Sequence, residues 1–336
     1  MEKIAHIRHT FLDANLVQLN VRPRVTIVIP TYNGSRFLRQ AIDSVLGQIY
    51  PNIELIVLDD GSTDDTRAVL EHYDNGFFWE RHANMGQAAT LNKGWRMAEG
   101  EILSYLSADD ILLPMAVHSA VQYMIANASV VLTYCAFNLI DPYSRIIRKV
   151  TPPDFDYLQM VRRLICPPGP GVFFRKWAFE RIGGWDHSLR QMPDFDYWLR
   201  LGSIGPFARI PEVLASFRIH DRSMTFSRVN RQRAAEPVRI MEKYYRNPDA
   251  LPAHIVSAFP DSMSNAHLIA AQLHLRSGRF ADALSALRVA ATYSKNTVLS
   301  SRNLRLLLNA VFNRLFHRIL WRLRRTASAT PLSTHI

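Results

Sequence analysis

The sequence predicts an α/β fold, in which a doubly wound, mostly parallel sheet with flanking helices is followed by an all-helical C-terminal extension. Two observations lead to this prediction. Short β-branched apolar runs alternate with helix-periodic segments between residues 25 and 110, and no strand pattern follows residue 229. The chain of 336 residues, 48% of them hydrophobic, is long enough for one domain of roughly 200–250 residues and an appendage.

Strand and helix patterns follow one another in the first third of the chain. Three apolar runs have the composition of buried parallel strands: RVTIVIP, IELIVLDD and EILSYLSADD. Helical spacing is present in the segments around them: residues 36–48, GSTDDTRAVLEHY and NMGQAATLNKGWRMAEG. Ser62 or Thr63 is the expected N-cap of the second helix, with Asp64 and Asp65 in its first turn.

Two of the expected strands end in a pair of carboxylates, Asp59-Asp60 and Asp109-Asp110. The carboxyl ends of parallel strands meet at one edge of a sheet, where open α/β proteins bind their ligands. A buried apolar strand does not itself require aspartates. The sequence therefore predicts a polar binding cleft at this edge.

The remainder of the chain predicts helices. HLIAAQLHLRSGRFADALSALRVAATY has a turn at Gly278 between two helical runs and resembles one tetratricopeptide-type hairpin. No second copy follows, so we interpret it as packing structure. The expected domains are a lead-in at 1–24, the α/β domain at 25–228 and a helical region at 229–336 with a basic amphipathic helix.

The positive charge is concentrated near the C-terminus. Of the net charge of +11, nine arginine or lysine residues follow residue 282 with no acid among them. The helix expected at about 304–325 either lies on an anionic membrane surface or packs on the body with a solvated arginine face. The two cysteines, and the lack of a secretory or membrane-spanning pattern, predict a cytoplasmic protein, peripheral on the inner face of the membrane if this helix binds lipid.

Residues 25–225 resemble the family-two inverting glycosyltransferases, which have a GT-A fold. The resemblance depends on six blocks in the expected order: VTIVIPTYNGSRFLRQAIDSVLGQ, IELIVLDDGSTDDT, NMGQAATLNKGWRMAEGEILSYLSADD, GVFFRKWAFERIGGWD, PDFDYWLRL and FRIHDRSMT. It implies transfer of a sugar from a nucleotide-diphospho-sugar to an acceptor hydroxyl, in cell-surface polysaccharide or glycolipid assembly. The resemblance ends near residue 230.

The resemblance implies a donor site at the strand ends. Pro30, Tyr32 and Asn33 would line the pocket for the nucleotide base, and Tyr32 would stack on it. Asp60 would accept a hydrogen bond from a base N–H. Arg218 would pair with diphosphate oxygens, as a guanidinium can do with two N–H groups at once.

A metal ion is also implied. Asp110 and His220 would contact Mg²⁺ or Mn²⁺, and Asp109 the ribose or the metal. A hard cation held by carboxylates offsets the negative charge of a diphosphate leaving group. Ser107 stands where the family often has an aspartate, which leaves the ligand details open.

The family pattern gives Asp194 the role of general base, which removes the acceptor proton as the hydroxyl attacks. Pro193 stands where the family usually has a glutamate. Asp196 is expected to form a structural salt bridge or cap in the helix that carries Arg200.

The resemblance thus predicts a metal-dependent inverting glycosyltransferase with a saccharide or lipid-linked acceptor. The alternative is a catalytically inactive GT-A scaffold that serves as a binding module through its helical C-terminus. The basic tail interleaves arginine with leucine, isoleucine and tryptophan, so no nucleic-acid partner is expected. The donor base, the sugar and the linkage stay open.

Overall fold

The computed structural model describes residues 22–73, 76–221, 223 and 228–310. They belong to two compact units. The first unit comprises Met1–Pro153, Pro168–Gly184 and Ile204–Arg218, and the second comprises Asp154–Pro167, Trp185–Ser203 and Ile219–Ile336. Most of the expected lead-in and residues 311–325 of the expected amphipathic helix lie outside the described residues. The domain boundaries expected from the chain order stay a prediction.

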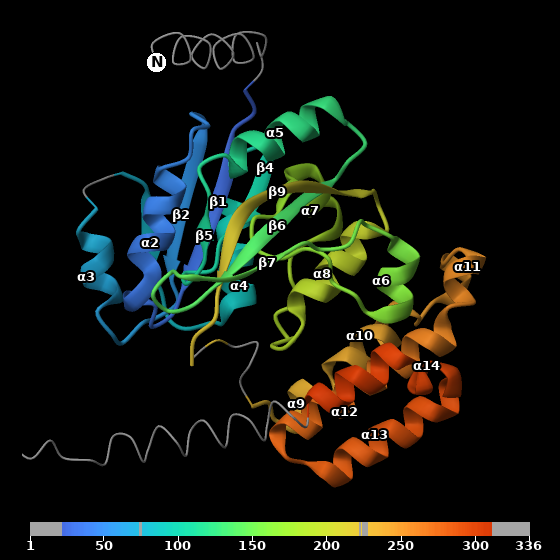
Figure 1. Cartoon of the computed structure of the whole chain (residues 1–336). Coiled ribbons are helices and arrows are strands. Elements are labelled where there is room, and N and C mark those ends of the chain that lie inside the picture. The colour runs from blue at the N-terminus through green and yellow to red at the C-terminus, as the bar shows by residue number, and fades with distance from the viewer. Residues whose placement is uncertain (1–21, 74–75, 222, 224–227, 311–336) are drawn as a thin grey trace, which may run out of the picture. The chain divides into compact units, whose positions relative to one another are not determined.

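The first unit contains a nine-stranded sheet in the order β3-β2-β1-β4-β8-β6-β9-β5, with β7 paired to β6 (Figure 1). The strands are β1 Val25–Thr31, β2 Ile53–Asp59, β3 Phe78–Arg81, β4 Ile102–Tyr105, β5 Ile111–Leu112, β6 Leu132–Ile140, β7 Ile146–Val150, β8 Phe173–Arg175 and β9 Phe207–Arg218. The run from β3 to β4 is parallel, as is the β6–β9 pair. The strands β5, β7 and β8 are antiparallel to their neighbours, so the sheet is mixed.

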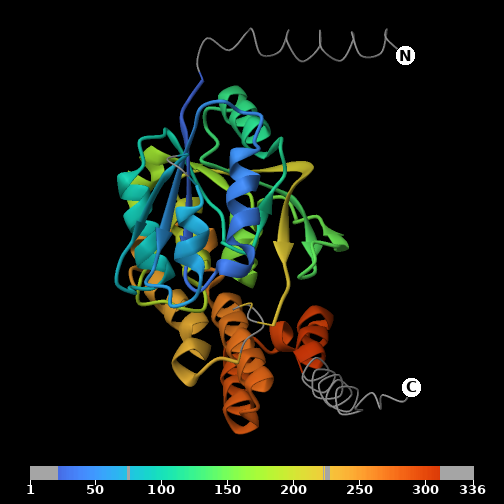
Figure 2. The same ribbon diagram turned by 90° about the vertical axis from the view of Figure 1, so that its left-hand side faces the viewer.

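Helices cover both faces of this sheet. They are α2 Ser35–Leu46, α3 Thr66–Glu71, α4 Gln87–Met97, α5 Ala116–Ala126 and α7 Lys176–Ile182. Ile27 and Ile29 of β1 join a buried core with residues of α2 and α5. Val28 faces α4, where a Cβ on Gly94 would lie 2.5 Å from Val28 Cγ1, so only glycine allows this approach. Figure 2 shows β1 and β2 between α2 and α4, which confirms the doubly wound α/β fold.

The register of β1 and β2 brings their ends together. Val25 is paired with Ile53 at one end of the ladder and Thr31 with Asp59 at the other. Every residue of β1 is buried. Tyr32 and Asp60 therefore leave the sheet side by side, at the edge where the sequence predicted a cleft.

Two local expectations need correction. The strand β3 was not predicted, because its four residues, FWER, contain no apolar run. The helix α3 begins at Thr66, later than expected, and neither Ser62 nor Thr63 caps it. Asp64 is not in the first turn but precedes the helix, and its Oδ1 accepts the N–H of Thr66 at 3.0 Å.

The second unit is helical. Its α-helices are α6 Tyr157–Arg163, α8 Pro193–Gly202, α9 Arg231–Ala234, α10 Glu236–Tyr244, α11 Ala253–Val256, α12 Phe259–Ser277, α13 Phe280–Tyr293 and α14 Lys295–Leu299. The expected hairpin is present as α12 and α13, and Gly278 between them has a left-handed φ of 83°. As predicted, no strand occurs among the described residues after 229. No helix within the described ranges is long and apolar enough to cross a bilayer.

Candidate active site

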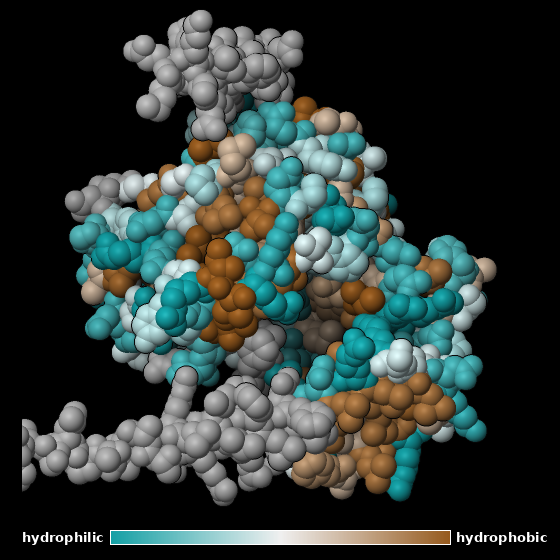
Figure 3. All heavy atoms as spheres, in the orientation of Figure 1, coloured by the Kyte–Doolittle hydropathy of each residue, from teal (hydrophilic) through white to brown (hydrophobic). Residues whose placement is uncertain are grey.

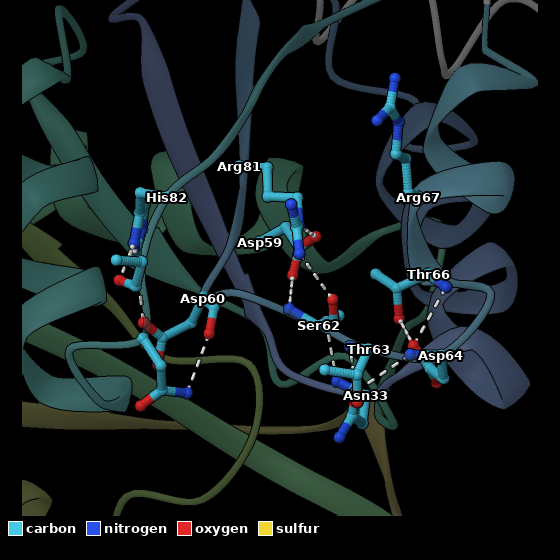
Figure 4. A network of polar contacts seen from close by, with 12 residues as sticks. Asn33, Asp59, Asp60, Ser62, Thr63, Asp64, Thr66, Arg67, Arg81 and His82 are labelled. Atoms are coloured by element: carbon cyan, nitrogen blue, oxygen red, sulfur yellow. Dashed lines mark hydrogen bonds and ion pairs between the residues drawn. The ribbon is translucent and has the colours of Figure 1, made fainter.

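Asn33 connects the loops that follow β1 and β2. Its side-chain Oδ1 accepts the N–H of Thr63 at 2.7 Å and that of Asp64 at 3.3 Å (Figure 4). Its own N–H donates to Ser62 Oγ at 2.8 Å. Asn33 has a left-handed φ of 52°, a conformation that asparagine tolerates better than most residues. The sequence-predicted residue is therefore placed at the strand ends, where it fixes both loops.

Asp60 holds the loop that precedes α4. Its Oδ1 accepts the N–H of Met85 at 2.6 Å, and its Oδ2 accepts the N–H of Gly86 at 2.9 Å. The amide of Asn84 donates to the Asp60 carbonyl at 2.8 Å. Asp60 is buried, so its carboxylate receives backbone donors where the family pattern implies a base N–H. A carboxylate can accept more than two hydrogen bonds, so Asp60 could still accept one from a nucleotide base. That role stays a prediction.

Arg81 and His82 are site residues that sequence reasoning missed, because they lie at the end of the unpredicted strand β3. Arg81 Nε lies 3.5 Å from Asp59 Oδ2, and its guanidinium donates to the Ser62 carbonyl at 3.0 Å. The ring of His82 lies beside Asp60, with 3.6 Å between Nδ1 and Oδ1 (Figure 4). In the sequence, the only sign of these residues is an Arg-His pair shortly before Asn84. The parallel pairing of β3 with β2 places Arg81 opposite Asp59, and so brings this pair to the ends of the strands.

Tyr32 and Pro30 differ in accessibility. Tyr32 is 55% exposed at the end of β1, so its ring presents a free face. Pro30 is buried inside the strand, opposite Leu58 of β2. The structure therefore leaves Tyr32 available for stacking and gives Pro30 a place in the sheet.

Asp110 is a buried carboxylate beside a second acid. Its Oδ1 accepts the N–H of Arg218 at 2.9 Å. Burial raises the pKa of Asp110 well above its ordinary value, and the charge of Asp109 raises it further. The backbone hydrogen bond from Arg218 opposes this shift only in part. The acid pair therefore carries an electrostatic cost that a bound cation would relieve.

Arg218 is buried and makes several hydrogen bonds within the protein. The residue has no exposed surface, and its guanidinium lies over the Phe37 ring, 4.6 Å from the centroid. The N–H groups of its side chain donate to four protein oxygens: those of the carbonyls of Asp109 and Asp141, Ser144 Oγ and Gln40 Oε1. In this arrangement the guanidinium binds protein oxygens and holds the loop of Asp109. The implied diphosphate contact stays a prediction.

Asp194 lies in the second unit, in the first turn of α8. Its Oδ1 accepts the N–H of Phe195 at 2.8 Å. Burial raises the pKa of Asp194, and backbone hydrogen bonds lower it by less. Burial also raises the pKa of the Cys166 thiol, with a further contribution from the charge of Asp194. The loop with Cys166 therefore lies near the predicted base.

Two other predicted residues lie in this unit. Asp196 forms the expected structural salt bridge, with its Oδ2 2.8 Å from an Arg200 nitrogen. His220 is mostly buried and donates its backbone N–H to Ser223 Oγ at 3.1 Å. Among the described residues, no cluster of three or more His, Cys, Asp or Glu side chains forms a metal site. The metal role of His220 stays a prediction.

Comparison with known proteins agrees with this fold. Residues 26–181 match the family model described as glycosyl transferase family 2. An uncharacterized glycosyltransferase of Rickettsia typhi is 33% identical over 218 residues, which are 62% of this chain and 68% of that protein. Chondroitin synthase of Escherichia coli is 28% identical over 63% of this chain and 31% of its own length.

Two solved structures have a similar fold. S. aureus TarS in complex with UDP-GlcNAc aligns with a TM-score of 0.54 at 15% identity, over 81% of this chain and 92% of that one. Mannosyltransferase PcManGT from Pyrobaculum calidifontis, in complex with GDP-Man and Mn²⁺, aligns with a TM-score of 0.56 at 20% identity, over 89% of this chain and 88% of that one. A longer TarS chain is covered to 54% of its length.

The mixed sheet, its flanking helices and these relatives define a transferase of the GT-A type. The chain belongs to glycosyl transferase family 2.

Proposed function

We propose that this glycosyltransferase is a metal-dependent, inverting enzyme that moves a sugar from a nucleoside diphosphate to an acceptor hydroxyl. The strongest support is the edge where β1 and β2 end. Asn33 fixes two loops there, Asp60 fixes a third, and Tyr32 presents an exposed ring beside them. A rigid polar edge with one free aromatic face suits a nucleotide base. The UDP-GlcNAc bound to TarS and the GDP-Man bound to PcManGT belong to this donor class.

The acid pair fits a divalent cation. Asp109 and Asp110 offer carboxylate oxygens, the ligands that Mg²⁺ and Mn²⁺ prefer. Burial is the main cause of the raised pKa of Asp110, and the neighbouring charge of Asp109 adds to it, so a cation would stabilise the ionised pair. We propose that these two residues hold the cation, with His220 as a further candidate ligand and PcManGT, which carries Mn²⁺, as a precedent. A bound cation would offset the charge that develops on the diphosphate.

Asp194 is the proposed base. Its raised pKa makes the ionised carboxylate a stronger proton acceptor than an ordinary aspartate. It takes the proton of the acceptor hydroxyl while that oxygen bonds to the anomeric carbon, and the bond from that carbon to the diphosphate oxygen breaks. Attack from the face opposite the leaving group inverts the anomeric configuration.

The acceptor is proposed to be a growing saccharide or a lipid-linked sugar in polysaccharide or glycolipid assembly. The chondroitin synthase relative supports a polysaccharide acceptor, although this chain spans only 31% of its length. No other observation on the acceptor is as specific.

A membrane surface is the proposed docking partner, and the protein is proposed to be cytoplasmic. Figure 3 shows apolar residues gathered over α13 and α14. The exposed large apolar residues of α13, of α14 and of residues 301–310 include Phe280, Leu284, Leu299, Leu304 and Leu308. The charged residues from 283 to 310 are all basic: Arg288, Lys295, Arg302 and Arg305. One acid, Asp282, lies in the first turn of α13 and pairs with Arg231. An apolar patch around which basic residues outnumber the acid suits an anionic bilayer better than water or an acidic protein.

A donor panel tests the activity. The protein is incubated with UDP-, GDP- and dTDP-sugars and a set of saccharide acceptors, with Mn²⁺ or with EDTA, and NMR of the product reports the anomeric configuration. We expect one donor class to react, only with the metal, and the product to have the opposite anomeric configuration. A product with retained configuration contradicts the inverting mechanism. A folded protein that neither binds nor turns over any donor favours the inactive scaffold.

A further inference from the structure

We propose that Glu236 is a positioning residue for the base: its carboxylate holds the backbone that leads into α8 and thereby orients Asp194. This inference rests on the proposed role of Asp194. It assigns part of the catalytic unit to the helical region beyond the six motif blocks, where the resemblance to glycosyltransferases has ended.

The carboxylate of Glu236 collects three consecutive backbone N–H groups. Its Oε1 accepts the N–H of Arg190 at 2.9 Å, and its Oε2 accepts those of Gln191 at 2.6 Å and Met192 at 3.1 Å. The residue is 2% exposed. Hydrogen bonds to an ionised acceptor are about twice as strong as neutral ones, and water does not compete with them here.

The held segment ends where Asp194 begins its helix. Met192 is the N-cap of α8, and Pro193 occupies the first helical turn without an N–H of its own. The Met192 carbonyl accepts the N–H of Asp196 at 3.2 Å. Met192 is therefore bound through its N–H to Glu236 and through its carbonyl to α8, so a shift of the Glu236 carboxylate is transmitted to the turn that carries Asp194.

A second residue of α10, the helix that begins with Glu236, contacts the same segment at Asp186 and Asp196. Lys243, near the C-terminal end of α10, places its Nζ 2.8 Å from Asp186 Oδ2 and 3.3 Å from Asp196 Oδ1. Burial would raise the pKa of Asp186, but hydrogen bonds from Lys243 and Ser188 lower it well below its ordinary value. The helix α10 thus contacts the base-bearing segment before α8 and within it.

A purely structural use of Glu236 is the competing explanation. Burying a carboxylate costs several kcal/mol unless its hydrogen bonds are complete. A neutral capping side chain such as serine could stabilise an ordinary turn without this cost. Here the buried charge holds the N-cap Met192 and the two residues before it, Arg190 and Gln191. A misplacement of about 1 Å in a catalytic group can cost roughly 100-fold in rate, which gives this attachment a catalytic consequence.

The test compares Glu236→Gln with Glu242→Gln, an exposed acid on the same helix. Glu236→Gln keeps the size of the side chain but removes the charge and one acceptor oxygen. We expect kcat to fall roughly 10- to 100-fold, while the Kd for the nucleoside diphosphate changes less than about twofold. Glu242→Gln should match the wild type. An unchanged kcat in Glu236→Gln overturns the proposal.

A double-mutant cycle separates positioning from structure. In an Asp194→Asn background, measured under single-turnover conditions, Glu236→Gln should cause no further loss, because it acts through the missing base. A loss as large as in the wild-type background overturns the proposal. If Glu236→Gln does not fold, Lys243→Gln replaces it in the cycle, since Lys243 contacts the same segment from a half-exposed position.

Failure of the proposed function has its own signature. If Asp194→Asn turns over like the wild type, Asp194 is not the base and the positioning role falls with it. Amide hydrogen exchange at residues 190–192 then still reports the contact itself. Exchange that is faster in Glu236→Gln than in the wild type supports hydrogen bonding of these amides to Glu236. Exchange as slow as in the wild type refutes it, whichever reaction the protein catalyses.

Discussion

Arg218 holds Asp110 by two routes. Its backbone N–H donates to Asp110 Oδ1 at 2.9 Å, and its side-chain Nε donates to the carbonyl of the preceding residue, Asp109, at 2.8 Å. The last residue of β9 therefore fixes an acid pair that lies about a hundred residues earlier in the chain. Through these two contacts Arg218 supports the proposed metal site.

Replacing Arg218 with methionine should therefore destabilise the protein. The change removes a fully buried guanidinium and leaves the carbonyls of Asp109 and Asp141 and the amide of Gln40 without their donor, at an expected cost of about 3–5 kcal/mol in the free energy of unfolding. Urea unfolding measures it. Arg67→Met is the control, since Arg67 pairs with Glu71 on the surface and should cost less than about 1 kcal/mol. Equal costs for both would contradict the buried role.

Asn33 allows the loop conformation and the loop hydrogen bonds to be separated. Asn33→Gly keeps the left-handed backbone and removes the acceptor of Thr63 and Asp64, which should cost about 1–3 kcal/mol. Asn33→Ala removes the same acceptor and adds backbone strain of about 1 kcal/mol more. Chemical unfolding of both variants checks this order. An alanine variant as stable as the glycine variant would speak against strain at this position.

The activity should depend on the ionisation of Asp194. Burial raises its pKa above the ordinary 3.8, so the base is lost as pH falls through a value higher than that of a free aspartate. The acid limb of the kcat profile should therefore lie at a higher pH than the pKa of an ordinary aspartate, and it should disappear in Asp194→Asn. The free energy of unfolding should change with pH in the opposite direction to the activity. The folded state binds the Asp194 proton more tightly than the unfolded state, so this contribution to stability is fully present below pH 3.8. It is lost as the pH rises through the pKa of Asp194 in the folded protein. An acid limb that persists in Asp194→Asn would assign it to another group.

The apolar patch predicts a measurable affinity for lipid. Leu284→Asp places a charge at an exposed apolar position of α13. It should weaken binding of the full chain to anionic vesicles at least about tenfold, since burial of one leucine is worth about 1.5–3 kcal/mol. Ile146→Asp, at an exposed apolar position on β7, is the control. Vesicle sedimentation with neutral and anionic lipid measures both. Equal binding by the two variants would exclude α13 as the docking surface.

The sequence predicted those strands whose burial leaves a continuous run of apolar residues in the sequence. β1, β2 and β4 are apolar runs, because helices cover both faces of a parallel strand. β3 is too short to show such a run. β6, β8 and β9 take their places through pairings between segments that are far apart in the sequence. β6 lies parallel to β9, for example, although about 75 residues separate their partners. No local pattern contains that register.

The same distinction holds for the candidate site. The strand-end rule describes Asp60, which directly follows β2. It does not describe Asp109 and Asp110, because β4 ends at Tyr105 and the acid pair lies in the turn before β5. It could not show that Arg218 is buried against Phe37, which depends on where β9 ends in the sheet. Glu236 was not foreseen at all, because a single glutamate in a helical region carries no motif. Its meaning comes only from the three N–H groups that it faces.

The most direct test of a metal-dependent donor site is a calorimetric titration of UDP, GDP and dTDP into the wild-type protein and Asp110→Asn, with Mn²⁺ and with EDTA. We predict that one nucleotide binds to the wild type with Mn²⁺, that EDTA weakens this binding strongly, and that Asp110→Asn abolishes the effect of the metal. Equal binding with Mn²⁺ and with EDTA, or no nucleotide binding to the folded wild type, would contradict the proposed metal-dependent donor site.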